Sequence, residues 1–125
     1  MEMQQVPEDQ WVQFANAFSR SHVGQPVTID VLMPDAGRRR IAQGLPLQGI
    51  SFDLRGTRPA SVQVSAGKET EGHVSHVIDM PMFIRLTKGN AGEDVALEIE
   101  PARGPMVQLV FGMEGRLGDA PIGEA

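Results

Sequence analysis

A chain of 125 residues with 41% hydrophobic side chains is long enough to bury one self-sufficient core. Its formal net charge of −5 disfavours a protein dedicated to duplex DNA or to an anionic membrane, because both partners require a basic face. The sequence has no cysteine, which excludes disulfides, a thiol nucleophile and cysteine-ligated zinc or iron–sulfur sites.

The first ten residues, Met1 to Gln10, are acidic and polar and lack the basic start and apolar centre of a secretory signal. The longest apolar stretch without a charge, Met80 to Ile84, is far shorter than the roughly 20 residues that a membrane-spanning helix needs. We therefore expect a cytoplasmic protein that does not engage a membrane.

The clearest local signal is a helix that starts near Pro7 and stops near Gly24. Proline suits the first helical position because an N–H there has no partner within the helix, and Glu8 and Asp9 place negative charge at the positive end of the helix dipole. An apolar stripe of helical period follows at Trp11, Phe14, Ala15 and Phe18. We expect this aromatic stripe to pack on a sheet.

After Gly24 the hydrophobic period changes from 3.6 to 2, which indicates strands. Each run is short, has one apolar face and is bounded by Gly, Pro, Asp or Asn. The predicted strands cover Val27–Leu32, Ile50–Arg55, Ser61–Ser65, His73–Ile78, Met82–Thr87, Val95–Glu100 and Val107–Phe111, with a weaker one over Arg39–Leu47. Turns are predicted at Lys88–Gly92 and Pro101–Pro105, and a polar loop at Ala66–Gly72.

Short strands at regular spacing, without a second helical pattern between them, favour antiparallel pairing over a parallel sheet. The sequence therefore predicts a mainly β (α+β) fold, in which an N-terminal helix precedes a small, mostly antiparallel β-barrel or sandwich of six to eight strands. We expect residues 1–111 to form this single domain. Residues 112–125 carry several glycines and little apolar content, which predicts a flexible C-terminal tail.

The first candidates for a site are His73 and His76. On a helix, an H-x-x-H pair can share one face and bind a metal, but on a strand residues three apart point to opposite faces. A zinc site would then need ligands from elsewhere, and His22 is the one remaining histidine. Three interpretations stay open, in this order: structural or surface histidines, one polar binding residue, and a metal ligand.

Four carboxylates lie on or beside predicted strands, at Asp30, Asp53, Asp79 and Glu98. Asp30 and Asp53 alternate with apolar residues, so we expect both to face solvent. The sequence contains no G-x-S-x-G, no Walker loop and no G-x-G-x-x-G after a predicted strand. We therefore predict no catalytic residue and no cofactor.

Arg38, Arg39 and Arg40 form the one basic run of the chain. Near a turn, three arginines can grip a phosphate backbone or an acidic partner, although such runs more often form a solvated edge that discourages sheet aggregation. The aromatic residues that stack on single-stranded RNA are sparse, since the chain has no tyrosine. The candidate binding residues are His76, His73, Arg38, Arg39, Arg40, Arg20 and His22.

Six segments spread between the helix and the last predicted strand form a distinctive set. They are Trp11-x-x-Phe14, Phe18-Ser19-Arg20-x-His22-x-Gly24, Val27-Thr28-Ile29-x-Val31-Leu32, Leu45-Pro46-Leu47-x-Gly49-Ile50-Ser51, His73-x-x-His76-x-Ile78 and Ala96-Leu97-Glu98-Ile99-Glu100. Over nearly the whole chain they resemble an uncharacterised family of small bacterial proteins known only as a domain of unknown function. The resemblance implies no activity, because that family has none assigned.

A second resemblance is local. A short helix followed by Pro26–Leu32, Leu47–Asp53, Ser61–Ser65 and Val74–Pro81 is similar to the Sm-like barrel of the RNA chaperone Hfq. This resemblance implies a small barrel and single-stranded RNA as a partner. The Hfq-type segment carries an aromatic residue and a lysine just before its histidine, whereas Val74 and Ser75 stand there in this chain, so only His76 carries over. The resemblance therefore supports RNA binding only weakly.

Three functional hypotheses follow. The first is a non-enzymatic interaction or assembly module, which uses exposed sheet edges to form an oligomer or to grip a protein partner. The second is an Sm-like RNA-binding protein that relies on Leu47–Asp53 and His76. The third is a metal-dependent enzyme centred on His73, His76 and a nearby carboxylate. We rank a protein partner or self-association first, and we expect neither a membrane nor duplex DNA as a partner.

Overall fold

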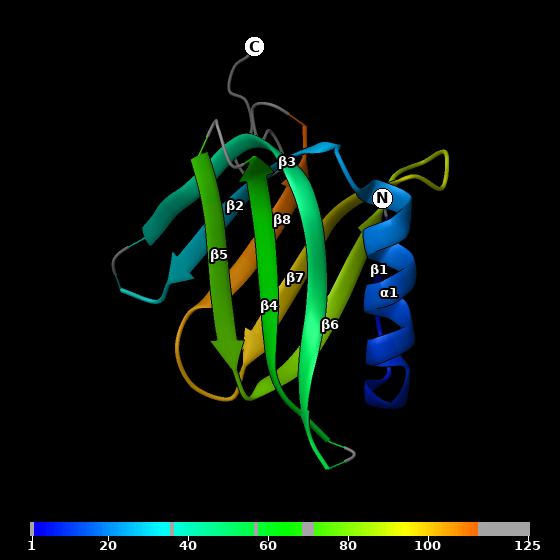
Figure 1. Cartoon of the computed structure of the whole chain (residues 1–125), viewed down its shortest axis with the longest axis vertical. Helices are drawn as coiled ribbons and strands as arrows, with labels where there is room; N and C mark the ends of the chain where they lie inside the picture. Colours follow the sequence, from blue (N-terminus) through cyan, green and yellow to red (C-terminus); the bar gives the residue numbers. More distant parts are fainter. Residues whose placement is uncertain (1, 36, 57, 69–71, 113–125) are drawn as a thin grey trace.

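The computed structural model describes residues 2–35, 37–56, 58–68 and 72–112 (Figure 1). The flexible tail predicted over 112–125 lies outside these residues except for Gly112. The elements are β1 (Glu2–Gln5), the short 3-10 helix η1 (Glu8–Gln10), α1 (Trp11–His22), β2 (Pro26–Met33), β3 (Gly37–Arg55), β4 (Arg58–Lys68), β5 (Gly72–Asp79), β6 (Pro81–Lys88), β7 (Asp94–Pro101) and β8 (Met106–Phe111).

Within the described residues, eight antiparallel strands form one sheet in the order β1-β6-β7-β8-β2-β3-β4-β5. This confirms the predicted mainly β class with one N-terminal helix. The sheet is not closed into a barrel by hydrogen bonds, because β1 and β5 each end it on one side. It bends instead, so that β3, β4 and β5 form a front layer over β6, β7 and β8 (Figure 1).

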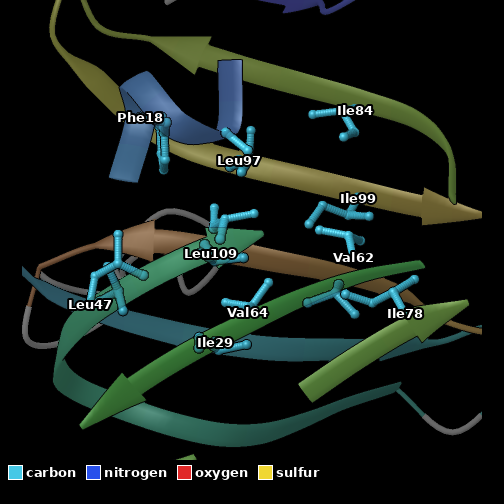
Figure 2. Close-up of a cluster of buried hydrophobic side chains, with 14 of the residues drawn as sticks. Phe18, Ile29, Leu47, Val62, Val64, Ile78, Ile84, Leu97, Ile99 and Leu109 are labelled. Atoms are coloured by element: carbon cyan, nitrogen blue, oxygen red, sulfur yellow. The ribbon is translucent and has the colours of Figure 1, made fainter. Parts of the chain in front are cut away.

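The core lies between these two layers. Figure 2 shows Val62, Val64 and Ile78 of the front layer facing side chains such as Leu97, Ile99 and Leu109 of the back layer. All six are buried, and within each strand they are two residues apart or stand alone, as side chains on one face of a strand do. The period-2 pattern therefore places the apolar face of each strand inside the sandwich.

The helix α1 lies beside the sheet and packs against β3. Trp11 is 1% exposed, stacks on Phe52 with ring centroids 5.6 Å apart, and donates its indole N–H to the carbonyl oxygen of Val6 at 2.9 Å. The hydroxyl of Ser19 accepts from the N–H of Ile50 at 2.8 Å. The aromatic stripe packs on the sheet as predicted, but Pro7 precedes the 3-10 helix η1 and is not the first residue of α1.

Two of the predicted boundaries are wrong. The segments predicted as separate strands, 39–47 and 50–55, belong to one strand, because β3 runs through residues 48–49 with only a shift of register against β4. A further bulge at Gly44 (φ 65°) lies against β2 and does not end β3 either. The N–H of Gly44 donates to the hydroxyl of Thr28 there, at 3.3 Å. The predicted loop over Ala66–Gly72 is also wrong at its start, because Ala66 is fully buried in β4, which continues to Lys68.

A single residue, Met80, carries the chain from the front layer to the back layer between β5 and β6. Its φ of 52° is the one positive value among the described residues other than glycine. Its N–H donates to the carbonyl oxygen of Ala60 in β4, and its carbonyl oxygen accepts from the N–H of Ala102 after β7, both at 2.9 Å. These two bonds hold the layers together at this corner.

Candidate functional site

The front layer ends at β5, and one side of this strand has no partner strand in the described chain. The bond from Met80 to Ala60 marks a hydrogen-bonded pair, and the register of β4 and β5 continues from it without a shift. Because such pairs alternate along antiparallel strands, the N–H and C=O groups of His73, Ser75, Val77 and Asp79 point away from β4. These groups form an open edge that can accept a further strand.

A cleft of about 260 Å³ lies along this edge. Its residues come from β5 on one side and from the β7–β8 hairpin on the other: His76, Val77, Ile78, Asp79, Pro101, Arg103, Pro105 and Val107. Val107 is 1% exposed and belongs to the core, so the bottom of the cleft is apolar.

Positive charge gathers around the cleft. Burial lowers the pKa of the half-buried His76 below its usual value, and the nearby guanidinium of Arg39 lowers that pKa further. Arg103 lies on the opposite wall. Within the described residues, neither Arg39 nor Arg103 forms an ion pair with a carboxylate. The cleft is therefore lined by one arginine, Arg103, by one carboxylate, Asp79, and by an imidazole that resists protonation, on which the charge of Arg39 also acts.

The basic run divides between the two faces of β3. Arg38 and Arg40 turn to Asp30, whose carboxylate lies 3.6 Å from Nη1 of Arg38 and accepts from Nε of Arg40 at 2.9 Å. The prediction that Asp30 faces solvent is wrong, because it is 1% exposed beneath these arginines. Arg39, between them in the alternating strand, lies near His76.

The three histidines occupy separate places. His73 lies on the outer face of β5, where its Nε2 donates to Oε1 of Gln48 at 3.0 Å, while His76 lines the cleft. His22 packs against the rings of Phe18 and Phe111, which also contact each other, and its Nε2 donates to Oδ2 of Asp94 at 2.8 Å. His22 therefore fastens the end of α1 to the sheet.

Arg20 lines a different depression, a polar groove of about 420 Å³ between α1 and the strands β3 and β4. Its other lining residues are Asn16, Ser19, Gln48, Gly49, Ile50, Ser51 and Ser65. Two of these residues contact the outer face of β5, Gln48 through His73 and Ser65 through Ser75, but none of them lines the β5 cleft. The structure thus places Arg39 close enough for its charge to act on His76, whereas Arg20 and His22 lie elsewhere.

Sequence reasoning missed Arg103 and the open edge itself. Arg103 lies in the Pro101–Pro105 turn, which was predicted, but nothing in the local pattern shows that this turn faces β5. In the part of the chain that the structure describes, no three His, Asp or Glu side chains gather in a metal-ligand arrangement. Nor does any described helix have the length and apolar content to cross a membrane.

Comparison with known proteins gives one match. A family model described as "Family of unknown function (DUF5335)" matches residues 2–117, nearly the whole chain. No curated protein matches the chain, and no solved structure does. The Sm-like resemblance therefore gains no support from the comparisons.

Proposed function

The chain belongs to this family of unknown function, and from its own surface we propose that it is a non-enzymatic interaction module that captures an extended segment of a partner protein as an added strand beside β5. The observation that carries the proposal is the open edge of β5 with the cleft along it. Strand addition satisfies the outward N–H and C=O groups of the edge, and pockets beside it supply specificity.

The composition of β5 supports this function. Proteins usually protect an exposed edge strand with lysine, proline, a bulge or very short length. β5 is eight residues long, pairs with β4 over all eight without a bulge, and contains neither lysine nor proline. Val77 on its outer face is 53% exposed. By contrast, the other end strand, β1, has only four residues. β5 therefore has the properties of a docking edge.

A partner segment suits the edge better than a second copy of the chain does. If two β5 strands paired antiparallel, each would bring its own Arg39 and Arg103 toward the same junction. Like charges placed together oppose such pairing. A single extended segment of another protein fills the edge without this repulsion.

The other two hypotheses have less support. Single-stranded RNA is usually held by stacking on aromatic side chains, and the described residues that line the cleft include no Phe or Trp. An enzyme built on His73 and His76 together would need their imidazoles on one side of β5. The two rings lie on opposite faces of that strand.

A displayed library of random twelve-residue peptides would test the proposal, followed by NMR titration of the selected peptides. We expect their binding to shift the amide signals of His73, Ser75, Val77 and Asp79 above all others. Val77→Pro removes an outward N–H and should weaken binding at least tenfold, whereas the matched Val77→Thr should bind like the wild type. If Val77→Pro does not fold, Val77→Lys blocks the edge by charge and leaves the backbone intact.

Two outcomes would overturn the proposal. One is binding of the selected peptides that is mapped away from β5 or is unaffected by the edge variants. The other is a concentration-dependent dimer, seen by analytical ultracentrifugation and abolished by Val77→Pro, which would make a second copy the natural occupant of the edge.

A further inference from the structure

We infer that the segment captured beside β5 carries one acidic side chain, aspartate or glutamate, that enters the cleft next to His76. This inference rests on the proposed strand capture and deepens it by naming the chemistry of the partner. Its basis is the position of the cleft relative to the edge, together with two arginines that have no carboxylate partner in the described chain.

The pleat of β5 determines which side chain of the partner enters the cleft. Side chains alternate between the two faces of a strand, and directly opposed residues on paired strands point the same way. His76 and Ile78 lie on the face toward the cleft and the core, while Ser75 and Val77 lie on the outer face. The partner residue opposite His76 therefore points into the cleft, and its two neighbours point outward.

The size of the cleft limits what enters. A volume of about 260 Å³ accommodates one side chain of moderate size, together with water. Pro101 and Pro105 line the hairpin side, and buried Val107 lies at the bottom. An apolar surround strengthens the interaction between charges that meet inside it, because it excludes water.

The charges of the site select an anion. Arg103 lines the cleft from the β7–β8 hairpin, and the charge of Arg39 in β3 acts on His76 of the cleft, so both arginines favour a carboxylate held there. Arginine is the side chain best suited to carboxylate recognition because its guanidinium offers paired donors. Asp79 also lines the cleft, and its negative charge disfavours a second acid beside it. One acid flanked by uncharged residues is therefore the expected pattern.

Three matched peptides test this inference. The first, acetyl-Thr-Val-Thr-Glu-Thr-Val-Thr-amide, places Val, Glu and Val on one face of a strand; the others carry Gln or Lys in place of Glu. We expect the Glu peptide to bind at least about tenfold more tightly than the Gln peptide at low salt, and the difference to shrink as salt rises. The Lys peptide should bind most weakly.

Variants that remove one arginine test which residues cause the preference for the Glu peptide. Arg39→Gln and Arg103→Gln should each remove most of the preference for Glu over Gln. The control Arg20→Gln, in α1 and not among the residues that line the cleft, should keep it. If the Glu and Gln peptides bind equally well along β5, the preference for an acidic side chain is refuted. The proposed capture of a strand beside β5 is not affected by that result. If none of the three shifts a β5 amide, the proposed strand capture of such segments fails as well.

The pH dependence gives an independent readout. A bound carboxylate favours the protonated imidazole, so the Glu peptide should bind more tightly as the pH falls from 7.5 to 6. The charged groups around His76 are Arg39, Arg103 and Asp79. The Gln peptide and the His76→Gln variant should show no such increase, and an increase in either would refute the placement of the acid beside His76.

Discussion

Replacing Asp30 by alanine is expected to destabilise the fold strongly, although the residue lies in a strand whose pattern suggests an exposed position. Its carboxylate is 1% exposed and accepts from Nε and Nη2 of Arg40 at 2.9 and 3.3 Å, with Nη1 of Arg38 at 3.6 Å. Without Asp30, two guanidinium groups lose a counter-charge that is itself shielded from water.

The expected loss follows from this geometry. Removing one partner of a buried ion pair costs about 3–5 kcal/mol. The side chains of Arg38 and Arg40 are 30% and 28% exposed and can regain some hydration, so we lower the expected loss to about 2–4 kcal/mol. A domain of this size has a free energy of unfolding of about 5–15 kcal/mol, so the loss is a large share of it.

Urea unfolding measures this free energy directly, because Trp11 is the single tryptophan of the chain and is buried. Asp53→Ala serves as the control, since Asp53 is exposed on β3, and should change the free energy of unfolding by less than about 0.5 kcal/mol. A double-mutant cycle with Arg40→Ala should show a coupling of about 1–3 kcal/mol. A loss below about 1 kcal/mol for Asp30→Ala would refute the reasoning.

Three further outcomes are expected. His22→Ala removes a ring packed against two phenylalanines and a hydrogen bond to Asp94, and should cost about 1–3 kcal/mol in urea unfolding; an unchanged midpoint would contradict this role. Met80→Gly relieves a left-handed φ and should raise stability by about 0.5–1 kcal/mol, seen as a higher thermal midpoint; a lower midpoint would argue against strain there. Folding lowers the pKa of His76, so protonation favours the unfolded chain and the wild type should lose stability as the pH falls through and below about 6.5. His76→Gln should lose less between pH 7.5 and 5.5, and parallel pH profiles of the two proteins would refute this.

Two strands of the back layer, β7 and β8, could be predicted from the sequence because bulky apolar residues recur at every second position in each. Their predicted bounds differ from the observed ones by no more than one residue at either end, although Ala96 and Val110 on the other face are buried as well. β1 has no such pattern, since all four of its residues are exposed and it is held by pairing with β6. A strand that forms only through hydrogen bonds to a neighbouring strand has no hydrophobic pattern by which its sequence could reveal it.

The candidate site was predicted only in part, for a related reason. Alternation places Asp30 on the face of β2 opposite Ile29 and Val31, and His76 on the same face of β5 as Ile78. It does not show which other parts of the chain cover these faces. Asp30 is buried by arginines eight and ten residues later in the chain, and His76 becomes part of a cleft through Arg103 in a distant turn. Local patterns identify such residues one at a time, and tertiary contacts decide which of them meet.

The strained corner at Met80 connects the stability of the fold to the proposed binding site. Its N–H and C=O hold Ala60 of the front layer and Ala102 of the hairpin, which is the same hairpin that forms the far wall of the cleft. The conformation of Met80 therefore helps to set the distance between the β5 edge and Arg103. Glycine would adopt this φ with less strain, and local strain of this kind is often kept where it serves a site. If the corner has this role, Met80→Gly should stabilise the fold while loosening the cleft, so that stability and peptide affinity change in opposite directions.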